Sequence, residues 1–148
     1  MLQACDAWDA VHPDPDAVAF AYAMADWALP FQFGSDHPNP AWVGGYAGGP
    51  GIGTAAYTEG MAAALAIAKR HADTDRAERY RRSVLLAQRF LLQLVVEPPD
   101  LFHYPSATHL GGVRRNLAGY TLRCDNAQHF LMAALRTARL LRDEEFRL

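Results

Sequence analysis

The sequence predicts an all-α protein built from two stacked antiparallel αα-hairpins, about four helices in all. Three observations predict this class. A segment recurs about 70 residues later, apolar residues recur at helical spacing, and long glycine- and proline-rich stretches separate the helical patterns. The repeat aligns without a gap at these pairs: Ala63/Ala133, Ala64/Ala134, Leu65/Leu135, Ala68/Ala138 and Asp73/Asp143. A repeat containing two helical segments favours stacked helical hairpins.

The division of the chain follows the repeat. We expect one domain or fragment over 1–148, made of a lead-in (1–13), a first repeat (14–73) and a second repeat (74–143). The first helix is predicted over residues 15–31, because Asp14 suits the N-cap and Pro15 the first helical position. A loop rich in Gly, Pro, Asn and Asp follows.

Three further helices are predicted, over 54–72, 75–95 and 125–142. Thr54 is the expected cap of the first of them, whose many alanines let neighbouring helices approach closely. A tight turn joins it to the next helix, and a second long loop precedes the last. Asp125 and Gln128 have the spacing of a capping box at the start of the last helix.

The connection lengths predict where the loops lie. A short turn between two helices produces an antiparallel hairpin, so both long loops should lie at the opposite end of the stack. Two helices would then start at that end, with the partial positive charge of their N-termini directed at the loops. Long loops in a compact domain are usually functional or disordered, and their convergence favours a functional face.

Composition excludes several classes of function. The chain has 148 residues, a formal net charge of −2 and one lysine, and its arginines are interleaved with acids. We therefore expect no nucleic-acid partner. The apolar stretches are too short for a membrane span, and the start has no signal-peptide pattern. Two cysteines without metal-ligand spacing fit a reducing compartment, so a cytoplasmic location is expected.

The loop motifs resemble a known superfamily. A Gly-Gly pair followed by an apolar residue precedes each copy of the repeat, as Gly44-Gly45-Tyr46 and Gly111-Gly112-Val113. With the glycine-rich continuation to Gly51, this pattern resembles the repeating unit of the α/α-toroids, over about residues 15–142. That superfamily includes six-hairpin glycosidase-like enzymes, sugar epimerases, and the terpenoid cyclase and protein prenyltransferase group. A closed toroid has more hairpins than this chain, so the resemblance implies a partial toroid that belongs to a longer enzyme or is completed by association.

The resemblance places an active site where the inner helices begin. Three residues near those starts are candidates for catalysis: Glu59, Asp125 and His129. A carboxyl in partly apolar surroundings can act as a general acid, and sugar chemistry commonly uses two carboxyl groups. Because His129 occupies the repeat position of Glu59, both side chains should point the same way. The alternative is structural, since a first-turn Glu favours the helix dipole and an N-cap Asp stabilises a helix start.

Six loop or helix-start residues are candidates for substrate binding: Trp42, Tyr46, Tyr57, Tyr104, Arg114 and Arg123. The aromatic side chains could stack on sugar rings, and these arginines, with Arg115, could hold a carboxylate or phosphate. Equally, the aromatic residues could seal the loops against the helix ends, and the arginines could pair with Asp100 or Asp125. We expect no metal ion and no cofactor.

These observations leave three functions open. The leading hypothesis is a portion of a carbohydrate-active enzyme, glycoside hydrolase-like or epimerase-like, with a small-molecule substrate. The second is a non-catalytic helical-repeat module that binds a protein, completes a partner's toroid or self-associates. Large apolar side chains exposed on the first and last helices would favour this second hypothesis. The third is a terpenoid cyclase-like or prenyltransferase-like domain with an aromatic-lined pocket.

Overall fold

The computed structural model describes residues 1–48 and 50–148, and Gly49, within the glycine-rich stretch, lies outside the described residues. The described chain forms five α-helices, and its extended segments are joined only by isolated bridges. The α-helices are α1 (Leu2–Val11), α2 (Pro15–Ala28), α3 (Gly53–Arg70), α4 (Thr74–Leu92) and α5 (Cys124–Leu140). Short 3-10 helices are η1 (Leu29–Phe31), η2 (Pro40–Trp42), η3 (Pro98–His103), η4 (Ala107–His109) and η5 (Asp143–Glu145). The predicted all-α class is confirmed.

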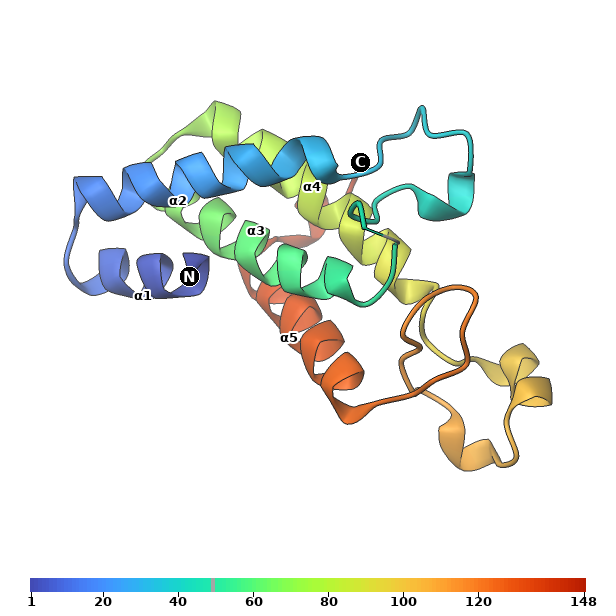
Figure 1. Ribbon diagram of the computed structural model, residues 1–148. Coiled ribbons are helices and arrows are strands. Elements are labelled where there is room, and N and C mark those ends of the chain that lie inside the picture. The colour runs from blue at the N-terminus through green and yellow to red at the C-terminus, as the bar shows by residue number, and fades with distance from the viewer. Residues whose placement is uncertain (49) are drawn as a thin grey trace.

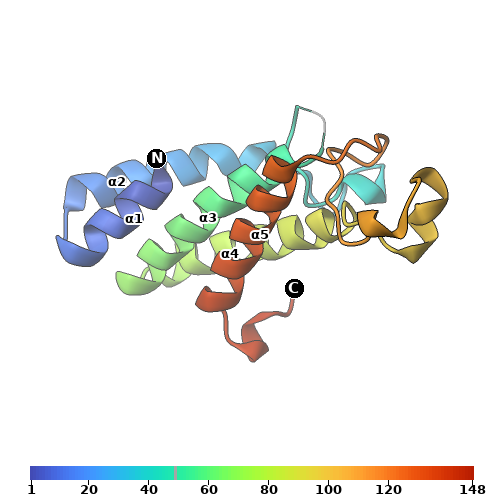
Figure 2. The same ribbon diagram turned by 90° about the horizontal axis from the view of Figure 1, so that it is seen from below.

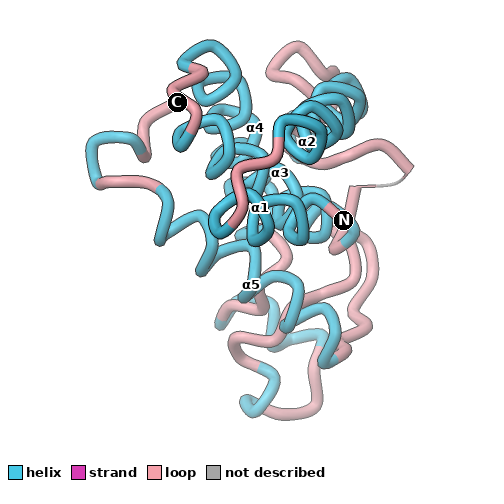
Figure 3. Tube along the Cα trace, turned by 90° about the vertical axis from the view of Figure 1, so that its left-hand side faces the viewer, coloured by secondary structure: helices cyan, strands magenta, loops and turns pink. Residues whose placement is uncertain are grey.

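Successive α-helices alternate in direction around a central helix. In Figure 1, α1, α3 and α5 run one way, and α2 and α4 run back. The central helix α3 contacts each of the other four. In the end-on view of Figure 3, α2 and α4 lie on one side of α3 and α5 lies on the other. The tight turn after α3 therefore produces the antiparallel α3–α4 hairpin that the connection lengths predict.

The main core lies along α3 and α4. Met61 and Leu65 of α3 belong to the same buried cluster as Tyr80 and Val84 of α4. Much of the remaining buried surface of α3 is alanine, which has no side chain beyond Cβ and so lets the surrounding helices come close. Burial of these apolar side chains is the main force that holds the hairpin together.

The lead-in of the first 13 residues is itself helical. Residues 2–11 form α1, so the chain has five α-helices instead of about four. Leu2 and Cys5 pack against a small cluster on α2 and α3. The buried carboxylate of Asp9 pairs with Arg70 and His71 at the end of α3. These contacts join residues about 60 positions apart, so the local pattern of residues 1–13 could not reveal them.

Asp14 caps α2 as expected, because its side chain accepts hydrogen bonds from the backbone N–H groups of Asp16 and Ala17. The predicted caps Thr54 and Asp125 were wrong, since each lies one residue inside its helix. Thr54 is the second residue of α3, and its hydroxyl accepts the backbone N–H of Tyr46 (3.2 Å). Asp125 is the second residue of α5, which begins at Cys124 after Arg123. The carboxylate of Asp125 accepts the backbone N–H of Asn126 (2.9 Å) and pairs with Arg123, so Asp125 bonds within the first turn of α5 without being its N-cap residue.

The sequence repeat continues in the backbone of the loops. Gly44 and Gly111 both have positive φ, at 90° and 77°. In the first repeat, Phe33 donates to the carbonyl of Gly45 (2.8 Å) and accepts from Gly44 (2.8 Å). Val96 makes the equivalent pair with Gly112 (2.8 Å) and Gly111 (3.0 Å). Each Gly-Gly segment therefore folds back onto the residues that follow the preceding helix. α4 ends at Leu92 and not at 95 as predicted, and Leu94 and Val96 instead pair with the second Gly-Gly segment and the residues that follow it.

The two long loops meet at one end of the helices, which confirms the topological prediction. The N–H of Ile52 donates to the carbonyl of Arg115 (2.8 Å), and Gly51 bridges Asn116. Figure 2 shows both loops together beyond the start of α3 and the end of α4. Among the described helices, none combines the length and the apolar character needed to cross a bilayer.

Candidate functional site

A buried carboxylate links three parallel helices. Glu59 of α3 is buried, and its Oε1 lies 2.7 Å from Nδ1 of His129 on α5. Its Oε2 accepts a hydrogen bond from Nε2 of Gln3 on α1 (2.7 Å). The side chain of His129 is about half exposed, at 46%. With Nδ1 held by Glu59, Nε2 is the imidazole nitrogen that remains for another molecule. Such a carboxylate–imidazole pair orients a proton-transfer group.

Asp125 is directed to a different partner. Its carboxylate accepts from Nε (3.0 Å) and Nη2 (2.9 Å) of Arg123, two residues earlier. This forked pairing is the geometry that guanidinium and carboxylate groups favour. The structure thus brings Glu59 and His129 into direct contact and pairs Asp125 with Arg123. Both side chains of the Arg123–Asp125 pair are substantially exposed.

Tyr46 and Tyr57 stack face to face beside the start of α3. Their ring centroids are 4.4 Å apart and their planes differ by 3°. Tyr46 is buried, and its hydroxyl bonds to Oγ of Ser83 on α4 (2.9 Å). Burial raises the pKa of Tyr46 to about 12. Tyr46 therefore seals the first loop against the hairpin, whereas Tyr57 retains an exposed face.

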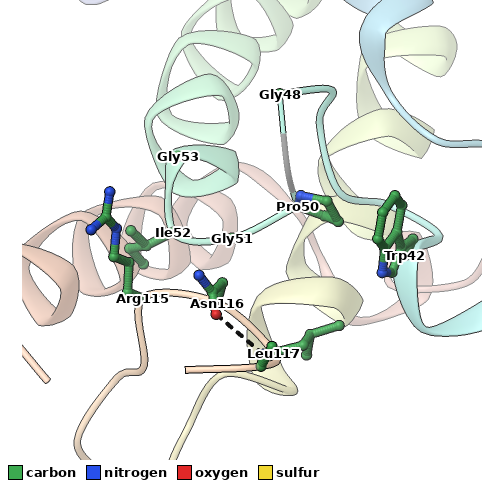
Figure 4. A pocket seen from close by; sticks show the side chains of 10 residues that line it. Trp42, Gly48, Pro50, Gly51, Ile52, Gly53, Arg115, Asn116 and Leu117 are labelled. Carbon is green, nitrogen blue, oxygen red and sulfur yellow. Dashed lines mark hydrogen bonds between the residues drawn. The ribbon is translucent and has the colours of Figure 1, made fainter. Parts of the chain in front are cut away.

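A pocket of about 530 Å³ lies where the two long loops meet. Trp42 from the first loop and Arg115 from the second lie on opposite sides of it in Figure 4, with Gly51 and Asn116 between them. The ring of Trp42 stacks on that of His37 at 5.4 Å. An aromatic face, an amide and a guanidinium suit a polar ring-containing ligand.

The three candidate catalytic side chains are not among the described residues that line this pocket. Of the predicted binding residues, Trp42 and Arg115 are found among them. The pocket and the Glu59–His129 pair are therefore two separate features. In the described residues, no three His, Cys, Asp or Glu side chains gather as a metal site requires.

Tyr104 and Arg114 order the second loop. Tyr104 stacks on His109 with ring centroids 5.2 Å apart. Arg114 donates to the carbonyl of Gln93 (2.6 Å) and lies 3.8 Å from the carboxylate of Asp100. Both side chains thus make the loop-sealing contacts that the sequence offers as the alternative to substrate binding.

Sequence reasoning missed Gln3 as a partner of Glu59. The signal is weak, because Leu2 and Cys5 start an apolar helical face but the next position on it is the buried, charged Asp9. A polar residue at a core position hides the helical period. The pocket residues Asn116 and Leu117 were missed for another reason, since only the meeting of the two loops places them beside Trp42.

Comparison of the chain with models of protein families, with curated proteins and with solved structures finds no match. The resemblance to the α/α-toroids therefore stays a prediction from the sequence.

Proposed function

We propose that the chain is a helical-repeat interaction module, an incomplete α/α-toroid whose last helix, α5, is covered by a helix of a binding partner. The single observation that carries this proposal is a contrast in burial between equivalent positions of the two repeats. Met61 and Leu65 of α3 are 1% and 0% exposed, whereas the equivalent Leu131 and Leu135 of α5 are 54% and 42% exposed.

The contrast has a structural cause. Met61 and Leu65 share a buried cluster with side chains of α2 and of α4, the helix that follows α3 in the chain. No further α-helix follows α5 in the described residues, so the same face of α5 meets solvent. Burying the exposed half of each leucine side chain would contribute about 1 kcal/mol. An exposed apolar face on a repeat helix is typical of a binding surface.

The opposite flank of the molecule supports the same function. Four large apolar side chains form an exposed stripe along α2 and η1: Phe20, Met24, Trp27 and Phe31. Their spacing of four, three and four residues places them on one helical face. Met24 and Trp27 also line an apolar groove of about 310 Å³ beside α1. Both ends of the helical array are thus apolar and open.

Photocrosslinking tests this proposal without assuming a partner. Benzoylphenylalanine is placed at Leu131, on the exposed face of α5, and in a control at Phe102, an exposed residue of the second loop. In cells that produce the protein, we expect position 131 to yield a discrete adduct and position 102 to yield none. A folded protein that gives no adduct at 131 would count against an interaction function.

The Glu59–His129 pair favours a second candidate function, acid/base chemistry on a sugar. In this mechanism Nε2 of His129 takes a proton from the substrate, and the Glu59 carboxylate stabilises the imidazolium through Nδ1. The short contact between the two side chains, and the half-exposed ring, support this role. Asp125, held by Arg123, would have no direct part, so proton transfer is favoured over a mechanism with paired carboxylates.

NMR spectra of the histidine rings test this second candidate. We expect a monosaccharide from a panel of glucose, mannose and N-acetylglucosamine to shift the His129 ring signals. Glu59→Gln should abolish the shift, and His109→Ala, in the second loop, should leave it intact. If none of the sugars moves the His129 signals in the folded protein, the sugar site is refuted.

A further inference from the structure

We infer that the partner of α5 is a second copy of this chain, which packs its α2 stripe antiparallel against α5 in a head-to-tail interface. This inference rests on the proposed interaction function and names its partner. It concerns the two open flanks of the molecule, which are the exposed face of α5 and the exposed stripe of α2.

The two exposed faces match in spacing when the helices run in opposite directions. Along α5, exposed residues follow one another at steps of three, four and four: Gln128, Leu131, Leu135 and Arg139. Along α2, the steps are four, four and three: Asp16, Phe20, Met24 and Trp27. Antiparallel packing therefore sets Leu135 beside Phe20 and Leu131 beside Met24. This is also the relative direction in which α4 covers the equivalent face of α3.

The charges at the ends of the two faces select the same orientation. Antiparallel packing sets Arg139, in the last turn of α5, beside Asp16, in the first turn of α2. Both are exposed, and neither forms an ion pair with a residue that the structure describes. Parallel packing would instead set Arg139 beside Trp27. The antiparallel arrangement joins opposite charges and apolar side chains at the same time.

The wider charge distribution agrees with this assignment. Residues 1–31 contain five aspartates and no lysine or arginine. Asp6, Asp9 and Asp26 pair with arginines of α3 and α4, whereas Asp14 and Asp16, at the start of α2, form no ion pair with a described residue. The second half of α5 carries Arg136 and Arg139, and Nε of Arg136 is buried without a hydrogen-bond partner in the described structure. Two α5 helices packed antiparallel on each other, with Leu131 beside Leu135, would set Arg139 beside the uncharged Gln128. The opposite flank of a second copy supplies an opposing charge.

A head-to-tail interface has a consequence that a symmetric dimer lacks. Each copy keeps one open flank after the first contact, so further copies can add until a ring closes or a filament forms. We therefore expect the mass of the assembly to rise beyond a dimer as the concentration increases.

Sedimentation of single and mixed variants tests the pairing of unlike faces. Leu131→Asp blocks the α5 face and Phe20→Asp blocks the α2 face, while Leu92→Asp, at the exposed end of α4, is the control. Each blocked variant should be a monomer by itself, and an equimolar mixture of the two should form a dimer and stop there. The control should assemble like the unmodified protein. Circular dichroism confirms that each variant is folded.

A charge exchange tests the register. Asp16→Arg and Arg139→Asp should each weaken assembly at least tenfold, and the double variant should recover most of it. Arg89→Asp, at an exposed position on α4, is the matched control and should have little effect. A purified protein that stays monomeric at all concentrations, or a Phe20→Asp variant that still dimerises by itself, overturns the inference. A monomeric protein that nevertheless crosslinks to a different protein through position 131 would overturn self-association and leave the interaction function standing.

Discussion

Replacing Gly44 by alanine should destabilise the protein far more than the same change at Gly111. The two glycines hold equivalent places in the repeat, and both have positive φ. They differ in their surroundings. A Cβ on Gly44 would lie 2.0 Å from the carbonyl oxygen of Leu86, in the backbone of α4, whereas a Cβ on Gly111 meets no described atom within 4 Å.

The expected losses of stability follow from the left-handed backbone at both glycines and from the close contact at Gly44. Left-handed backbone costs an L-residue about 1–2 kcal/mol, and this cost applies at both sites. Overpacking against atoms that cannot move aside adds about 1–3 kcal/mol, and this applies to Gly44 alone. Alanine also lowers the conformational entropy of the unfolded chain, which stabilises the folded state equally in both variants and therefore cancels in the comparison. We therefore expect Gly44→Ala to cost about 2–5 kcal/mol and Gly111→Ala about 1–2 kcal/mol.

Urea unfolding followed by circular dichroism measures both free energies of unfolding. Low protein concentration keeps association from contributing to them. Equal losses at the two positions, or a larger loss at Gly111, would refute the close contact between the first Gly-Gly segment and α4.

Two further predictions concern the core and the C-terminal segment. Leu65→Ala should lower the free energy of unfolding by about 2–5 kcal/mol, but Leu135→Ala by less than about 1 kcal/mol, because only Leu65 is fully buried. Urea titrations of dilute protein measure both losses. Similar losses would contradict the burial contrast between the repeats. The Arg142 N–H and the Lys69 ammonium lower the pKa of Glu145 from 4.5 to about 2, so its contribution to stability is present above about pH 4.5 and is lost as the pH falls towards 2. Glu145→Gln should therefore destabilise the protein at neutral pH. Below about pH 2, the melting curves of the variant and of the unmodified protein should converge. A difference in melting temperature that persists there would exclude the ion pair as its cause.

Local patterns predicted most of the helical framework. The Asp14–Pro15 pair marked the start of α2 correctly, because an N-cap acts only on the next turn of its own helix. The Gly-Gly motifs predicted equivalent loop segments, and Gly44 and Gly111 indeed share a left-handed backbone. The predicted meeting of the two long loops followed from connection lengths alone.

Side-chain partners were harder to predict. The repeat predicted that Glu59 and His129 point the same way from their helices, but it could not show that the two side chains bond to each other. It could not show that Gln3 would take the second carboxylate oxygen, because α1 owes its position to contacts with distant residues. Asp125 was assigned to the helix start, but the forked guanidinium of Arg123 lies within reach and engages both carboxylate oxygens.

The sequence by itself determined four of the five described α-helices, their alternation and the end at which the loops gather, because spacing and turn lengths act over a few residues. Only the tertiary structure decided which apolar residues become core and which remain open. Leu65 and Leu135 are the same residue at equivalent positions, and the presence of α4 over one and of solvent over the other separates them. Burial depends on what lies opposite a side chain in space, and no local pattern specifies that.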